Sequence, residues 1–552
     1  MRISARRFGI CFVFAFVPYI QAGYAQQPCE SLTSLRLDRA TVVSAVTVPA
    51  APLKAQPWSW FPLPPTTVPT HCEVRGIARP SSDSEINFEL WLPPASAWNG
   101  KYEQRGNGGW AGGIPSWDLV TPLVRGYAAA ATDDGHSTTS QTPDASFAIG
   151  HPEKLIDFGY RAVHQTALQS KAILLAYYGQ AATKSYFHGC SDGGREALME
   201  AQRFPEDFDG IVAGAPANNW TRHFTGFVWN EAALGSTPAV LLPVAKLQLI
   251  QQAVLAKCDK LDGVTDGLLE DPRVCHFDPA ALKCAGADLP DCLTAAQVEA
   301  VAKIYGGPVS PRTGEHIYPG YEPGTEADPA GWRIWITGGV QSQFGNSFFS
   351  AAVYENPKWD WRTMELDRDL KFADEKVGPI LNSYNPDLRS FRDHGGKLIQ
   401  YHGWGDGAIA PRDSIAYYEK VQSFLKQFPD PRSDSAQPVQ SFYRLFMVPG
   451  MGHCAAGVGP NHFGNDDIAD PAVWPQDADH DVAFALDRWV TQGIAPDQII
   501  GTGRIGGDPK DPSKGVKMTR PLCAFPKVAH YQGTGDTNDA ASFVCADPAS
   551  KQ

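Results

Sequence analysis

Charged residues are scarce in this sequence, and the basic ones form no cluster. Asp, Glu, Lys and Arg make up 19% of the 552 residues, with 47 basic against 60 acidic side chains and a formal net charge of −13. Nucleic acids and anionic membranes attract proteins through clustered Lys and Arg. The composition therefore argues against both as partners, and an apolar content of 43% is typical of a globular core.

Long apolar runs are also missing after residue 25, where no segment reaches 18 consecutive apolar residues. A soluble mature protein is therefore predicted. Residues 1–25 have the features of a secretory signal: arginines, an apolar stretch from Phe8 to Ile20, and small residues at Gly23 and Ala25. The alternative, a membrane anchor, needs a longer apolar stretch. Cleavage after Ala25 predicts a secreted or periplasmic protein with a net charge of about −16 (44 basic against 60 acidic side chains).

Eleven cysteines occur, and Cys11 lies in the predicted signal. The remaining ten form an even set, as expected for disulfides in an oxidising compartment. Cys190 and Cys454 must come close if their neighbours Ser191 and His453 form a nucleophile–base pair. Local spacing suggests the other four pairs, Cys29–Cys72, Cys258–Cys275, Cys284–Cys292 and Cys523–Cys545.

The length exceeds what one ordinary core supports, so an insertion or a second domain is expected. Strands and helices alternate on either side of a stretch rich in Gly, Pro, Trp and Phe, which predicts an α/β fold with a mostly parallel sheet flanked by helices. We predict a catalytic domain formed by residues 26–218 and 366–552, and an inserted lid domain formed by residues 219–365. The expected strands include Tyr127–Thr132, Ser185–His188, Gly210–Gly214, Lys397–His402 and Phe442–Val448.

The run Gly189-Cys190-Ser191-Asp192-Gly193 has the G-x-S-x-G pattern of a nucleophile turn. Such a turn joins a strand to a helix so tightly that side chains at its glycines would clash, and it lifts the serine hydroxyl above the sheet edge. A strand is expected before Ser191 and a helix after it, with a third glycine at Gly194. This context favours a catalytic nucleophile over the alternative, a structural tight turn.

Ser191 needs a base to take its proton, and the base needs an acid to orient it. In the α/β-hydrolase fold the chain order is serine, acid, histidine. We predict His453, in a glycine-rich loop after the last expected strand, as the base and Asp406, in the loop after an earlier strand, as the acid. His402 competes as base although it precedes the acid loop, and Asp413 competes as acid although a helix is expected there.

A developing oxyanion needs two backbone N–H donors. The residue after the nucleophile, Asp192, is predicted to supply one of them. The second is expected from the loop after an early strand, where Gly108 or Gly109 would let the backbone approach the substrate. The alternative for these two residues is a plain glycine turn.

Residues 258–268 combine three aspartates with turn glycines, a dense group of hard oxygen ligands that suits calcium. The segment is similar to an EF-hand loop but lacks its full D-x-D-x-D-G pattern and its closing Glu. The alternative is a solvated acidic turn. We expect a structural calcium ion in the lid and no organic cofactor. The expected ligands are the carboxylates of Asp259, Asp262 and Asp266 and the carbonyls of Val264 and Leu268.

Several of these motifs resemble the tannase/feruloyl esterase family, which includes a bacterial mono(2-hydroxyethyl) terephthalate hydrolase. The resemblance covers most of the mature chain. It implies an α/β-hydrolase with a large lid, a serine–histidine–aspartate triad, a disulfide joining the triad neighbours, and lid calcium, at the positions given above. The motifs are Gly189–Arg195, Phe204–Gly210, Gly214–Ala217, Tyr401–Asp406 and Gly450–Cys454.

The resemblance also implies a serine carboxylesterase that hydrolyses esters of aromatic acids: ferulate and related hydroxycinnamates, gallate, or a terephthalate monoester. Arg333 or Arg362 is the expected partner of a substrate carboxylate. Some lid aromatics should stack on the substrate ring, although a place in the lid core is the alternative for each. These aromatics include Trp220, Phe224, Phe227, Trp229, Trp332, Trp335, Phe344, Phe348 and Phe349.

Two other classes of protein remain open at this point. A catalytically silent binding module on the same fold usually loses a triad member, whereas the sequence provides all three. A serine peptidase or lipase would share the triad, but the aromatic lid favours a compact aromatic acyl group.

Overall fold

The computed structural model describes residues 26–53, 66–114, 116–138, 143–235, 240–428, 438–465, 475–504 and 515–548. The predicted signal, residues 1–25, lies outside these ranges. Within them, no helix has both the length and the apolar character that a membrane crossing requires.

A nine-stranded sheet forms the centre of the molecule, in the order β1-β4-β5-β7-β6-β8-β9-β10-β11. Strands β1, β4, β5 and β7 pair antiparallel, and all pairs from β7 to β11 are parallel. The prediction of a mostly parallel sheet is thereby confirmed. The strands are β1 (Ala40–Val48), β4 (His71–Ala78), β5 (Ile86–Leu92), β6 (Lys101–Arg105), β7 (Ala128–Thr132), β8 (Lys184–Cys190), β9 (Gly210–Gly214), β10 (Lys397–Gly403) and β11 (Tyr443–Val448).

Helices cover both faces of the parallel strands. Successive strand residues point to opposite sides, so apolar side chains are present on both faces and both need to be covered. Ile211 and Leu398 pack with helices α3, α4 and α13 on one face. Their neighbours Val212 and Ile399 pack with α14 on the other face. Burial on both faces explains why these strands appear in the sequence as apolar runs. The helices are α3 (Ala162–Tyr178), α4 (Asp192–Arg203), α13 (Pro411–Leu425) and α14 (Val482–Gln492).

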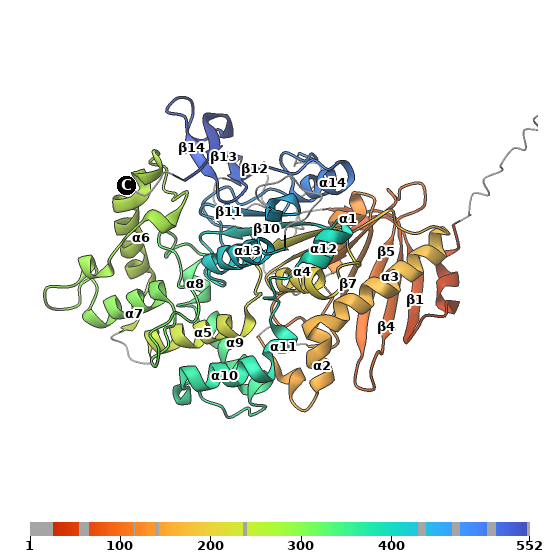
Figure 1. Ribbon diagram of the computed structural model, residues 1–552, viewed down its shortest axis with the longest axis horizontal. Coiled ribbons are helices and arrows are strands. Elements are labelled where there is room, and N and C mark those ends of the chain that lie inside the picture. The colour runs from red at the N-terminus through yellow and green to blue at the C-terminus, as the bar shows by residue number, and fades with distance from the viewer. Residues whose placement is uncertain are drawn as a thin grey trace, which may run out of the picture.

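A largely helical insertion separates β9 from β10, and Figure 1 shows it as the yellow-to-green group to the left of the sheet. It includes the segment predicted as a lid, but it continues past residue 365. Helix α10 follows that boundary and still packs against α5, where the Thr221 hydroxyl donates a hydrogen bond to Asp374. The longer helices are α5 (Trp220–Leu234), α6 (Val244–Cys258), α7 (Ala295–Gly306), α9 (Val340–Ser347) and α10 (Leu366–Lys376). Shorter ones are α8 (Trp332–Trp335) and α11 (Gly378–Leu381). Helix α12 (Arg389–His394) follows them and packs with the core of the sheet through Phe391.

The C-terminal part adds two small antiparallel pairs next to β11. They are β12 (Gln498–Arg504) with β13 (Val516–Cys523), and β14 (Val528–Tyr531) with β15 (Phe543–Ala546). All five predicted disulfides are present, one of which joins β13 to β15.

Candidate active site

Ser191 lies at the sharp turn between β8 and α4, with φ 67° and ψ −120°. Left-handed backbone of this kind is strained for a non-glycine residue and is typical of a nucleophile turn. The glycines make it possible. A Cβ on Gly189 would lie 2.6 Å from the carbonyl oxygen of Gly193, and one on Gly194 would lie 2.2 Å from that of Gly214.

The structure brings Ser191, His453 and Asp406 together at the carboxyl edge of the parallel strands. Ser191 Oγ lies 2.9 Å from His453 Nε2, and His453 Nδ1 lies 2.8 Å from Asp406 Oδ2. The three residues follow β8, β11 and β10, which end at the same edge because they run parallel. This spacing allows the hydroxyl to pass its proton to the imidazole.

Asp406 is buried and fully hydrogen-bonded. Its Oδ1 accepts from the amides of Ala408 and Ile409 at 2.7 and 2.9 Å. Its Oδ2 accepts from His453 and also from His402 Nε2 at 3.1 Å. Burial alone would raise the pKa of Asp406, but the two histidines hold that pKa far below its usual range. The carboxylate therefore stays ionised.

The two competitors for catalytic roles are placed elsewhere. His402 contacts Asp406 rather than Ser191, so it is not positioned as the base. Asp413 lies in α13, where Asn219 Nδ2 and the Tyr384 hydroxyl approach its carboxylate at 3.3 Å. Burial raises the pKa of Asp413 to about 7. The role of His402 beside Asp406 was missed from the sequence, although its place four residues before the acid was a usable signal.

The Cys190–Cys454 bridge joins the two residues that flank the Ser191–His453 contact, with Cα atoms 5.9 Å apart. Cys454, like Ser191, has left-handed backbone, with φ 63°. The bridge therefore ties together two loops that both hold unfavourable conformations.

The amides predicted for an oxyanion hole come from two segments that touch. Asp192 belongs to the nucleophile turn, and Gly108 and Gly109 follow Asn107, which contacts that turn at Gly193. Among the described residues, the N–H groups of Asp192, Gly108 and Gly109 find no hydrogen-bond acceptor. Asn107 fixes the glycine loop to α4, because its carbonyl accepts from Gly193 N at 2.7 Å and its amide donates to Glu196 at 3.0 Å. This clamp by Asn107 and Glu196 was also missed from the sequence.

Most of the lid aromatics form a core rather than a pocket. Trp335 is the exception at the triad, since its ring meets the His453 ring edge-on with centroids 5.0 Å apart. Phe344 lies against Gly109, and Trp332 is buried against Tyr305. Of the aromatics predicted to line the lid, those that are 2% exposed or less are Trp220, Phe224, Phe227, Trp332, Phe348 and Phe349.

Neither arginine predicted to bind a substrate carboxylate is directed at the triad. Arg333 is exposed on α8. Trp335 follows two positions later, and side chains two positions apart on a helix point in nearly opposite directions. Arg362 is also exposed, pairs with Asp360 at 3.0 Å and lies over the Trp361 ring.

The aspartates of residues 258–268, here called the acidic loop, accept hydrogen bonds from nearby backbone amides. Asp259 accepts from Gly267 N, Asp262 from Val264 N and Glu270 N, and Asp266 from Leu268 N, each at 3.1 Å. Burial and the nearby charge of Asp266 raise the pKa of Asp262 to about 6. Arg520 pairs with Asp266 at 2.7 Å and also acts on Asp262 through its positive charge. This excess of negative hard oxygens fits a divalent cation such as calcium.

The acidic loop also contacts the loop that carries His453. A Cβ on Gly450 would lie 2.6 Å from Leu268 Cδ2, so the Leu268 side chain packs directly against the backbone of Gly450. Val264 packs with Phe543 of the C-terminal pair. This loop of the insertion therefore contacts both the loop that carries His453 and the C-terminal strands.

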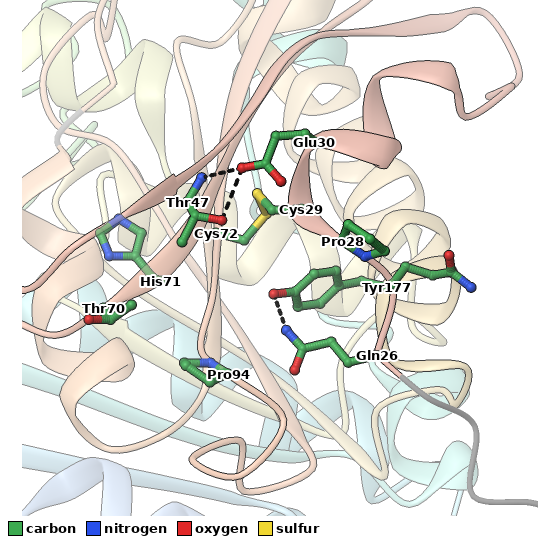
Figure 2. A pocket seen from close by; sticks show the side chains of 11 residues that line it. Gln26, Pro28, Cys29, Glu30, Thr47, Thr70, His71, Cys72, Pro94 and Tyr177 are labelled. Carbon is green, nitrogen blue, oxygen red and sulfur yellow. Dashed lines mark hydrogen bonds between the residues drawn. A yellow bond between two sulfur atoms is a disulfide. The ribbon is translucent and has the colours of Figure 1, made fainter.

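A surface pocket of about 360 Å³ lies away from the triad, beside the Cys29–Cys72 disulfide (Figure 2). Its polar groups are largely paired with one another: Glu30 accepts from the amide and hydroxyl of Thr47, and Gln26 donates to the Tyr177 hydroxyl. The pocket contains none of the residues predicted to act in catalysis.

The chain is similar to esterases of known sequence and structure. The family model described as tannase and feruloyl esterase matches residues 72–546. An uncharacterized esterase of Xanthomonas campestris is 41% identical, covering 99% of this chain and 96% of its own. The mono(2-hydroxyethyl) terephthalate hydrolase of Piscinibacter sakaiensis is 34% identical, covering 87% and 85%. The crystal structure of feruloyl esterase B from Aspergillus oryzae aligns with a TM-score of 0.83 at 29% identity, covering 94% and 99%.

Proposed function

The chain belongs to the tannase and feruloyl esterase family and is a carboxylic ester hydrolase of the α/β-hydrolase fold that acts on esters of aromatic acids; we propose that Ser191, His453 and Asp406 form its catalytic triad. The hydrogen-bonded chain Ser191–His453–Asp406 carries this proposal. It has the geometry and the chain order that a serine esterase requires.

In the proposed reaction, Ser191 Oγ attacks the ester carbonyl while His453 Nε2 takes the hydroxyl proton. Asp406 holds the Nδ1–H tautomer of His453 and stabilises the imidazolium. The oxyanion accepts hydrogen bonds from the amide of Asp192 and from that of Gly108 or Gly109. His453 then protonates the leaving alcohol, and a water molecule, activated by the same histidine, releases the aromatic acid.

Replacement of Ser191 tests the triad directly. We expect Ser191→Ala to abolish the burst of p-nitrophenol from an activated aromatic ester while the circular dichroism spectrum stays unchanged. Ser34→Ala, at an exposed serine, is the control and should match the wild type. Full turnover in Ser191→Ala would contradict the mechanism.

For the acyl group, we propose a neutral aromatic acid of the hydroxycinnamate type. Trp335 is the lid aromatic in contact with His453, and neither Arg333 nor Arg362 is directed at the triad. A terephthalate monoester would bring a second carboxylate that needs a cationic partner, and hydrolysis of that monoester is the alternative. Turnover of methyl ferulate, methyl gallate and the terephthalate monoester decides between them, and a higher kcat/KM for the monoester would overturn the proposal.

Trp335 is the proposed contact of the substrate ring. Trp335→Ala should raise KM for methyl ferulate several-fold, because an aromatic pair contributes about 0.5–1.5 kcal/mol beyond its buried area. The matched control is Trp229→Phe, since Trp229 lies on α5 and donates to the carbonyl of Lys303 instead. An unchanged KM in Trp335→Ala would remove Trp335 from the site.

We also propose that the acidic loop holds a structural calcium ion. The carboxylates of Asp259, Asp262 and Asp266 with the carbonyls of Val264 and Leu268 would hold it, and the ion would offset the charge gathered there. We further propose that the protein is secreted and that its signal is cleaved after Ala25. The mass of the exported protein tests the cleavage site. The five disulfides suit an oxidising compartment.

A further inference from the structure

A second histidine, His402, forms a hydrogen bond to the same carboxylate oxygen of Asp406 as His453 does. His402 Nε2 is 3.1 Å from Asp406 Oδ2, and His453 Nδ1 is 2.8 Å from that atom. The other oxygen of Asp406 is held by two backbone amides. His402 is completely buried, so its contacts are all within the protein.

The hydrogen bonds around His402 fix which of its nitrogens carries the hydrogen. Nε2 faces two acceptors, Asp406 Oδ2 and the carbonyl of Ile409, both at 3.1 Å, so it must donate. Nδ1 lies 2.7 Å from Ser414 Oγ. That hydroxyl accepts from Gln400 Nε2 at 2.6 Å, and its own hydrogen is free to be donated to Nδ1, the nitrogen that carries no hydrogen in this tautomer.

This chain of bonds continues into the core. Gln400 Oε1 accepts from the Tyr443 hydroxyl, which fixes the orientation of the amide. Gln400 and His402 lie on β10, Ser414 on α13 and Tyr443 on β11, so three packed elements determine the orientation of one imidazole. An arrangement of this kind is costly to bury unless every member is satisfied, and these members are.

We propose that His402 is a positioning residue, whose Nε2–H holds Asp406 Oδ2 toward His453 and shares its negative charge. This inference rests on the proposed triad. Since two N–H groups divide one oxygen, each bond is weaker than it would be alone. Loss of the His402 bond would let Asp406 turn away from His453, and it would also leave Asp406 a stronger partner for the imidazolium form of His453. The first effect lowers turnover. The second favours the form of the enzyme in which His453 is protonated and cannot act as the base.

The test compares His402→Leu with His402→Gln, because a glutamine places an N–H donor close to the position of Nε2 and a leucine places none. For His402→Leu we expect kcat to fall about 10- to 100-fold, the range for one hydrogen bond to a charged group. KM should change little, because His402 is fully buried and its hydrogen-bond partners, Asp406, Ile409 and Ser414, are not proposed to contact substrate. The acid limb of the kcat/KM profile should move to higher pH, and His402→Gln should restore kcat and the acid limb in part.

Most other titratable groups near this network keep one charge state near pH 7. His223 on α5 has a pKa lowered by burial to about 3, and Tyr318 and Tyr321 have pKa values raised well above their usual range by burial, so all three stay neutral near pH 7. Burial also raises the pKa of Tyr443 well above its usual range. Asp413, whose pKa burial raises to about 7, can change its charge near neutral pH. The shift of the acid limb should therefore persist when His402→Leu is made in an Asp413→Asn background.

The outcomes separate the two proposals. A merely structural role for His402 would lower the melting temperature without moving the acid limb, and that result overturns the inference, as does a wild-type kcat. If His402→Leu does not fold, His402→Phe carries the test, because a phenyl ring fills the space of the imidazole without an N–H donor. It should shift the acid limb in the same direction, and an unchanged profile overturns the inference. Turnover that survives Ser191→Ala would instead overturn the triad and the inference with it.

Discussion

The Cys190–Cys454 bridge should contribute to both stability and catalysis, and a double replacement separates these contributions. The bridge links the residue before Ser191 to the residue after His453, and Ser191 and Cys454 both have positive φ. Without the bridge, the loop of His453 can relax away from its strained conformation. We therefore expect Cys190→Ala/Cys454→Ala to be less stable and to lose part of the Ser191–His453 alignment.

The size of the stability loss follows from the length of chain that each bridge closes. Cys190 and Cys454 are 264 residues apart, whereas Cys284 and Cys292, the matched control, are 8 apart. In the chain-entropy model the first closure stabilises by about 5.6 kcal/mol and the second by about 2.5 kcal/mol. The long bridge should therefore cost about 3 kcal/mol more to lose. Misplacement of a catalytic group by 1 Å can cost about 100-fold, so we expect a fall in kcat of about 10- to 100-fold for the long bridge alone.

The assay is denaturant unfolding of both double variants, with kcat on methyl ferulate measured well below each unfolding midpoint. Cys190→Ala/Cys454→Ala should show the lower midpoint and the lower kcat, and Cys284→Ala/Cys292→Ala should retain wild-type kcat. Equal losses of stability in the two variants would refute the entropy argument. A wild-type kcat without the long bridge would show that packing alone holds the Ser–His geometry.

Three further predictions concern individual carboxylates. Asp406→Asn should lower kcat about 10⁴-fold, because an amide no longer favours the required tautomer of His453, and a loss below tenfold in single-turnover measurements would argue against its role. Burial raises the folded-state pKa of Asp413 to about 7, so its protonated form stabilises the fold fully below about pH 4 and this contribution disappears as the pH rises through about 7. Thermal melts from pH 5 to 8 should therefore decline less in Asp413→Asn than in the wild type, and parallel curves would contradict the assignment. Removal of calcium by a chelator should lower the melting temperature of the wild type and leave Asp262→Asn unchanged, whereas calorimetric titration without any calcium signal would exclude the ion.

Local requirements explain why parts of the site could be predicted. The turn at Ser191 needs glycines where the backbone of Gly193 and Gly214 comes within 3 Å of a Cβ position, so the pattern of glycines appears in the sequence itself. The parallel strands are buried on both faces and appear as apolar runs. The even number of cysteines outside the predicted signal and their local spacing predicted the bridges that the structure contains.

The sequence by itself thus determined the mostly parallel sheet, the cysteine pairs, the nucleophile turn and the order of the residues that meet there, because each depends on neighbours in the chain or on the direction of the strands. Only the tertiary structure decided which lid aromatics are core and which faces His453, since Trp332 and Trp335 differ in what other segments place against them. The second donor to Asp406 was likewise decided by packing. His402 becomes a positioning candidate because α13 and β11 bring Ser414 and Tyr443 to β10, and burial requires each polar group to find a partner.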